Sequence, residues 1–150
     1  LSLAQIKSLP NVFGGVELLT LSACNTATGG GANGKEVEGF GVLAQRQGAK
    51  AVVASLWPVA DRSTKLLMQE FYRIREAKKG APKVEALRQA QLKLLSGEVT
   101  AGPLVQQSRQ VVHERAKPGA NAQPTFKVDP KAPFAHPYYW APFILIGNWR

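Results

Sequence analysis

The sequence predicts an α/β domain in which a mostly parallel sheet is flanked by helices. The first observation is a pair of short apolar runs, 16–23 and 50–57, which are typical of strands buried in a parallel sheet. The second is a helical stretch between them, because strand, helix and strand within about 40 residues form the parallel crossover unit. The third is composition: 150 residues, 45% hydrophobic and 19% charged, suffice for one packed domain.

The first part of the chain provides the crossover unit. The apolar run 16–23 leads into Cys24, and a glycine-rich loop follows at 27–34. A helix is expected at 36–47, with Gly48 placed to end it in the left-handed conformation. The second strand then runs parallel to the first.

Two helices are expected after the second strand. Pro58 ends the strand, and Asp61 is expected to cap the helix that follows. Within 62–79, large apolar residues recur at helical spacing, so one face should pack on the sheet. These residues are Leu67, Phe71 and Ile74. Gly80 breaks this helix, and another is expected to begin at Pro82. The apolar stripe predicted for this helix consists of Val84, Leu87, Leu94 and Leu95.

The last third of the chain changes in character. Residues 97–135 are polar, rich in glycine and proline, and lack clear periodicity, which predicts an irregular surface insertion. An aromatic cluster at 138–140 then introduces a third buried strand at 142–147. Three strands and three helices leave at least one sheet edge without a neighbour, and the chain begins at Leu1 without a start residue. We therefore expect residues 1–150 to be the C-terminal part of one α/β domain.

Composition argues against several classes of protein. No apolar run approaches the roughly 20 residues that a membrane helix needs, so no membrane partner is expected. A single cysteine cannot form an internal disulfide or a cysteine-based zinc site, and no metal or cofactor is expected. One thiol and no visible signal peptide favour a cytoplasmic protein.

The formal net charge is +9, and basic side chains are concentrated in the predicted helices. Nine Lys or Arg residues lie between positions 61 and 95, against four Asp or Glu residues. Such a bias is compatible with nucleic-acid binding. However, these basic residues alternate with apolar ones at helical spacing, which is typical of the solvated faces of two helices. A nucleic-acid partner is therefore not expected.

Cys24 and Asp61 are the candidate functional residues, because each follows the end of a predicted strand. In open parallel sheets, ligands bind beyond the carboxyl ends of the strands. By position alone, Cys24 is either a small buried residue or a nucleophile activated by N–H groups of the glycine-rich loop. A nucleophile needs a base. The two histidines are His113, in the insertion, and His136, for which a structural role beside the aromatic cluster is favoured.

The glycine-rich loop also suggests an alternative function. GGGANGK at 29–35 satisfies the G-x-x-x-x-G-K part of a phosphate-binding loop. The next residue should be Ser or Thr to hold magnesium, but it is Glu36, whose charge would repel a phosphate. Nucleotide binding is accordingly the less favoured interpretation.

Five blocks of the sequence resemble the CHAT domain family, in order and over nearly the whole chain outside 97–135. The blocks are LTLSACNT at 19–26, GKEVEGF at 34–40, GAKAVVASLWPVAD at 48–61, EALRQAQ at 85–91 and HPYYWAPFILIG at 136–147. CHAT domains are caspase-like cysteine peptidases related to separase, typically bacterial or attached to helical repeats. The resemblance therefore implies a caspase-like sheet, a protein substrate and a helical-repeat region of the tetratricopeptide type in the same protein.

The resemblance also implies roles for individual residues. Cys24 matches the family's nucleophile, and its backbone N–H would supply one donor to the oxyanion hole. The family's catalytic histidine lies upstream of the cysteine strand, so it is expected before Leu1, and neither His113 nor His136 matches its position. Asp61 matches an acid in the pocket that receives a basic side chain before the scissile bond, although Ala60 replaces the first acid of that element.

The expected function is therefore that of a caspase-like cysteine peptidase that cleaves protein substrates after a basic residue. Cys24 is the expected nucleophile and Asp61 the expected substrate-binding residue, a role that is compatible with capping a helix. Because the catalytic histidine is expected upstream, the 150 residues alone should be inactive. The alternative is a protein-binding or scaffold module that keeps the fold without the reaction.

Overall fold

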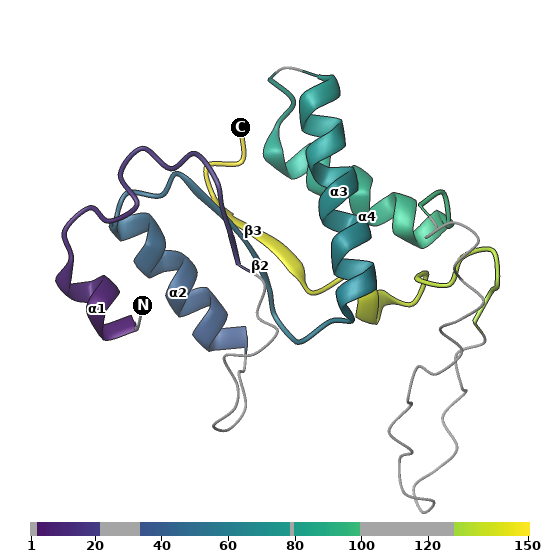
Figure 1. Ribbon diagram of the computed structural model, residues 1–150, viewed down its shortest axis with the longest axis horizontal. Helices are drawn as coiled ribbons and strands as arrows, with labels where there is room; N and C mark the ends of the chain where they lie inside the picture. The colour runs from purple at the N-terminus through teal and green to yellow at the C-terminus, as the bar shows by residue number, and fades with distance from the viewer. Residues whose placement is uncertain (1–2, 22–33, 79, 100–127) are drawn as a thin grey trace, which may run out of the picture.

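The computed structural model describes residues 3–21, 34–78, 80–99 and 128–150, which form a three-layer α/β arrangement (Figure 1). The middle layer is a three-stranded sheet in the order β1-β2-β3. Its strands are β1 (Leu19–Leu21), β2 (Ala51–Ser55) and β3 (Phe143–Gly147). The helices are α1 (Leu3–Ser8), α2 (Gly34–Arg46), α3 (Asp61–Ala77), α4 (Lys83–Ser96) and the 3-10 helix η2 (Pro137–Tyr139). Figure 1 shows α2 on one side of the sheet and α3 and α4 on the other.

The sheet is mixed rather than mostly parallel in the described part of the chain. β1 runs parallel to β2, with Leu21 opposite Ala54, as the crossover unit predicts. β3 runs antiparallel to β2, with Phe143 opposite Ser55. The sequence pattern could not predict the direction of β3, because a short apolar run suits a buried strand in either orientation.

Helices on both faces explain why the first four residues of β2 are all apolar. All five of its residues are buried. Val53 belongs to a core cluster formed with the apolar faces of α3 and α4. Val52 and Ala54 point the other way, into a second cluster that includes Ala44 of α2. A strand covered in this way needs apolar side chains at successive positions.

The apolar face predicted for α3 is confirmed, whereas the stripe predicted for α4 is half wrong. Leu67 and Phe71 are fully buried. In α4, Leu87 and Leu94 are buried, but Val84 and Leu95 are 43% and 42% exposed. The buried face of α4 is completed by two small residues, Ala86 and Ala90. The prediction considered only large apolar residues. The helix also packs through Ala86 and Ala90, which lie one turn apart, and Leu94 follows one turn later on the same face.

Both ends of the expected insertion at 97–135 meet at the end of α4. Gly97 caps this helix in the left-handed conformation, with φ of 76°. A Cβ atom at this position would lie 2.4 Å from the carbonyl oxygen of Lys131, so the returning chain passes directly over the cap. Residues 100–127 of the expected insertion lie outside the described part of the structure.

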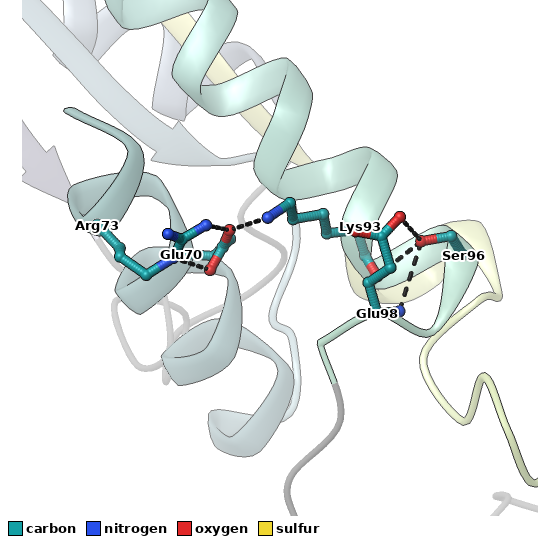
Figure 2. Close-up of polar contacts among 5 residues, drawn as sticks. All are labelled: Glu70, Arg73, Lys93, Ser96 and Glu98. Atoms are coloured by element: carbon teal, nitrogen blue, oxygen red, sulfur yellow. Dashed lines mark hydrogen bonds and ion pairs between the residues drawn. The ribbon is translucent and has the colours of Figure 1, made fainter. Parts of the chain in front are cut away.

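A partly shielded ion-pair cluster links α3 to α4 (Figure 2). Glu70 is 8% exposed, and its carboxylate accepts hydrogen bonds from Arg73 Nε at 2.8 Å and from Lys93 Nζ at 2.6 Å. These bonds hold the pKa of Glu70 at about 2, mainly through Arg73 and despite partial burial. Because Arg73 belongs to α3 and Lys93 to α4, the carboxylate fixes the two helices to one another.

Replacing Glu70 with glutamine is expected to lower the free energy of unfolding by about 1–3 kcal/mol at pH 7. The folded-state pKa of about 2 lies below the ordinary 4.5, so the ionised carboxylate favours the folded protein. Its contribution is complete above about pH 5.5 and disappears as the pH falls toward 2. Urea denaturation of both proteins at several pH values should therefore show curves that differ at pH 7 and converge near pH 2.

Glu85→Gln is the matched control for this prediction. Glu85 also has a pKa of about 2 because Arg88 and Gln89 donate hydrogen bonds to it. Its pair with Arg88 lies within one helix at the surface. The loss should be smaller than for Glu70→Gln. Equal losses in the two variants would show that the link between helices adds nothing.

Candidate active site

The parallel pair β1–β2 brings two chain segments to the same edge of the sheet. Leu21, the last residue of β1, lies opposite Ala54 near the end of β2. Cys24 follows Leu21 by three residues in the sequence but falls within 22–33, outside the described residues. Asp61 follows the end of β2 by six residues and is described. The structure therefore places one of the two predicted site residues.

Asp61 is the first residue of α3 and is exposed. The prediction that it caps the helix is wrong by one position. Ala60 is the N-cap, with φ of −59° and ψ of 132° and no side-chain cap bond. The first turn is supported instead by Ser63, whose hydroxyl donates to the Ala60 carbonyl at 2.9 Å. Asp61 still lies in the first turn of α3, where a negative charge interacts favourably with the helix dipole.

The segment 56–60, which connects β2 to Asp61, is held along its whole length. The Leu56 N–H donates to the Pro142 carbonyl at 3.0 Å, in line with the β2–β3 ladder. Trp57 Nε1 donates to the Tyr138 carbonyl at 3.1 Å. Val59 is 7% exposed and packs in the core with α3. A segment restrained in this way presents the following residue in one defined position.

The aromatic segment 135–142 forms a wall beside this connection. The Tyr138 hydroxyl donates to the Pro58 carbonyl at 2.8 Å, and its ring lies 6.4 Å from the Trp57 ring. The segment is itself fixed to α4, because Gln91 Nε2 donates to the carbonyls of Trp140 and Phe143, each at 3.0 Å.

His136 has a structural role, as predicted. Its Nδ1 atom accepts a hydrogen bond from the Tyr138 N–H at 3.1 Å and so caps η2. His113 lies outside the described residues.

Two polar features of this region were missed in the sequence. One is the pair of hydrogen bonds that joins Tyr138 to Trp57 and Pro58. In the sequence, the only sign of this contact was the aromatic cluster at 138–140. The other is Thr64, one turn into α3, whose buried hydroxyl oxygen has no hydrogen-bond partner among the described residues. Nothing in the spacing of the sequence marks Thr64.

Metal and membrane features were sought in the same parts of the chain. Among the described residues, no group of three or more His, Cys, Asp or Glu side chains is placed to hold a metal ion. Within residues 3–21, 34–78, 80–99 and 128–150, no helix has the length and apolar character required to cross a membrane.

A comparison with protein-family models decides the family. The CHAT domain model matches residues 1–148. The chain belongs to the CHAT domain family. Searches of the curated proteins and of the solved structures found no match. The resemblance inferred from the five sequence blocks is thus confirmed, and the match extends from before β1 to one residue past β3.

Of the two candidate site residues of this CHAT domain, Asp61 lies in the described part of the structure together with its surroundings. Asp61 and the segment that carries it come from one block of the family resemblance, and the aromatic wall beside them comes from another. The residues that follow β1 up to Asn33, Cys24 among them, belong to the CHAT match but not to the described structure.

Proposed function

We propose that this CHAT domain is part of a caspase-like cysteine peptidase that cleaves proteins after Lys or Arg. One observation carries the proposal. β1 and β2 are parallel neighbours, so both strands end at the same edge of the sheet. In the sequence, Cys24 follows the end of β1 and Asp61 follows the end of β2. Sites of open α/β sheets form at this edge, where the loops after the strands converge.

The reaction would begin with attack of the Cys24 thiolate on the carbonyl carbon of the scissile peptide bond. A C–S bond forms, and backbone N–H groups near Cys24 stabilise the oxyanion. Collapse of this intermediate breaks the C–N bond, and a histidine upstream of Leu1 protonates the leaving amine. Water then hydrolyses the thioester, which releases the acid product and restores the thiol.

Asp61 would select the substrate. A carboxylate at the start of a helix can hold a guanidinium group through two charge-assisted hydrogen bonds, or an ammonium group through one. Asp61 is exposed and follows a restrained segment, so it is accessible and defined in position.

The alternative is a protein-binding module of the same fold. The observation that favours it is that His136 Nδ1 caps η2, a structural use of the histidine that a binding module would share. In either case, we propose a cytoplasmic protein with protein partners and a tetratricopeptide-type helical region in the same polypeptide, and without a nucleic-acid or membrane partner.

Labelling of Cys24 by peptide acyloxymethyl ketones tests the peptidase proposal in the natural protein, any flanking sequence included. Four probes would carry Arg, Lys, Leu or Asp before the reactive ketone. The Arg and Lys probes should label Cys24 at least tenfold faster than the Leu probe, and peptide mass spectrometry would identify the site. Labelling that shows no preference among the four probes would contradict the proposal of a basic pocket.

Asp61→Asn should remove this preference, because the substitution deletes the charge while keeping the shape of the side chain. Iodoacetamide, which has no side chain to recognise, is the control and should alkylate Cys24 equally in both proteins. A parallel fall in the unfolding temperature and in labelling by every probe would instead assign Asp61 to the stability of α3.

A further inference from the structure

The exposed aromatic residue Tyr138 makes more polar contacts than its burial would suggest. The residue is 47% exposed, so it contributes little to the core. Yet three of its polar groups are engaged. The hydroxyl donates to Pro58, the carbonyl accepts from Trp57, and the N–H donates to His136 Nδ1. These hydrogen bonds, rather than core packing, fix the place of Tyr138 in the fold.

Two of these three bonds reach the segment that ends at Asp61. The segment lies 80 residues earlier in the chain, so its attachment to Tyr138 is a tertiary contact. The segment is also supported on either side of Trp57 and Pro58, by the bond of the Leu56 N–H to the Pro142 carbonyl and by the buried Val59 with the Ser63 hydroxyl on the Ala60 carbonyl. Tyr138 thus anchors Trp57 and Pro58, which lie between these supports.

We propose that Tyr138 is a positioning residue for Asp61, and that it sharpens the preference for a basic side chain before the scissile bond. This inference rests on the proposed function, because it takes Asp61 as the group that binds the substrate. Tyr138 holds the Trp57 side chain through its carbonyl and the Pro58 backbone through its hydroxyl, and the segment so held aims the first turn of α3. His136 supports this arrangement, because its side chain caps η2 and holds the Tyr138 backbone in place.

The chain offers a matched pair of substitutions for the test. Tyr138→Phe removes the hydroxyl that donates to Pro58 and keeps the ring. Tyr139→Phe makes the same chemical change at the next residue. The Tyr139 ring packs edge-on against Phe134 at 5.3 Å, and its hydroxyl makes no hydrogen bond within the part of the chain that the structure describes.

The measurement is the ratio of labelling rates of Cys24 by the Arg and Leu probes in the natural protein. Tyr138→Phe should reduce this ratio roughly three- to tenfold, the range expected for one neutral hydrogen bond. Tyr139→Phe should leave the ratio unchanged. Iodoacetamide rates should be equal in all proteins, because neither tyrosine acts on the thiol.

Amide hydrogen exchange tests the positioning role of Tyr138 independently of any peptidase activity. The Thr64 N–H donates to the Ala60 carbonyl in the first turn of α3. Its exchange should be faster in Tyr138→Phe than in the wild type and unchanged in Tyr139→Phe. Unchanged exchange in Tyr138→Phe would overturn the proposal whether or not the protein is a peptidase.

The outcomes separate the inference from the function on which it rests. If Asp61→Asn abolishes the Arg preference but Tyr138→Phe does not reduce it, the positioning role is overturned and the peptidase proposal stands. If Asp61→Asn keeps the preference, the basic pocket fails and the positioning role fails with it. Equal losses in Tyr138→Phe and Tyr139→Phe would show a general effect on the aromatic segment and would also overturn the inference.

Discussion

Replacement of Cys24 by alanine is expected to lower the rate of peptide cleavage by the natural protein roughly 10⁴-fold or more. The sequence contains one cysteine, so no other thiol in these 150 residues can replace the nucleophile. Without the sulfur atom no thioester can form, and only the binding and oxyanion contributions to catalysis remain. The measurement is the steady-state hydrolysis of a peptide with Arg before the scissile bond.

The same variant also separates the two candidate functions. Circular dichroism and thermal unfolding should match those of the wild type, because removal of one thiol changes little in volume. Binding of a protein partner should survive in the variant under both hypotheses. Full cleavage activity in Cys24→Ala would end the peptidase proposal, and cleavage absent from the wild type as well would favour the binding module.

Leu94→Ala is expected to lower the free energy of unfolding by about 2–5 kcal/mol. Leu94 is fully buried in the core cluster that joins α3, α4 and the sheet. Its loss removes apolar contacts and leaves a cavity between three elements that can collapse only in part. Urea denaturation would report the change as a lower midpoint at a similar slope.

The neighbouring leucine is the control for this change. Leu95 is 42% exposed, although both residues belonged to the stripe predicted from the sequence. Leu95→Ala should cost no more than about 0.5 kcal/mol, as is usual for surface positions. A large loss in Leu95→Ala would show that a further part of the protein covers this face of α4.

Local patterns predicted most of the elements but not how distant ones meet. The strand–helix–strand unit and the buried face of α3 followed from periodicity and from the turn residues Pro58 and Gly48. The left-handed conformation of Gly48, with φ of 102°, was expected. A Cβ atom there would lie 2.3 Å from Asn11 Oδ1, a long-range contact that no local pattern encodes.

The candidate site was predicted in part for the same reason. The position of Asp61 near the start of a helix followed from the strand end before it, although Ala60 takes the capping position. The contribution of Tyr138 required knowledge that residues 80 positions apart meet. The role of Cys24 stays a prediction from the sequence and the family, since it lies outside the described residues.

The reversed direction of β3 has a practical consequence. Because β3 is antiparallel to β2, its first residue lies beside Ser55 and its last, Gly147, beside Ala51. A dye attached at position 150 would therefore lie at the rim remote from the mouth that peptides would approach. Immobilising the protein through that position should leave substrates free to enter.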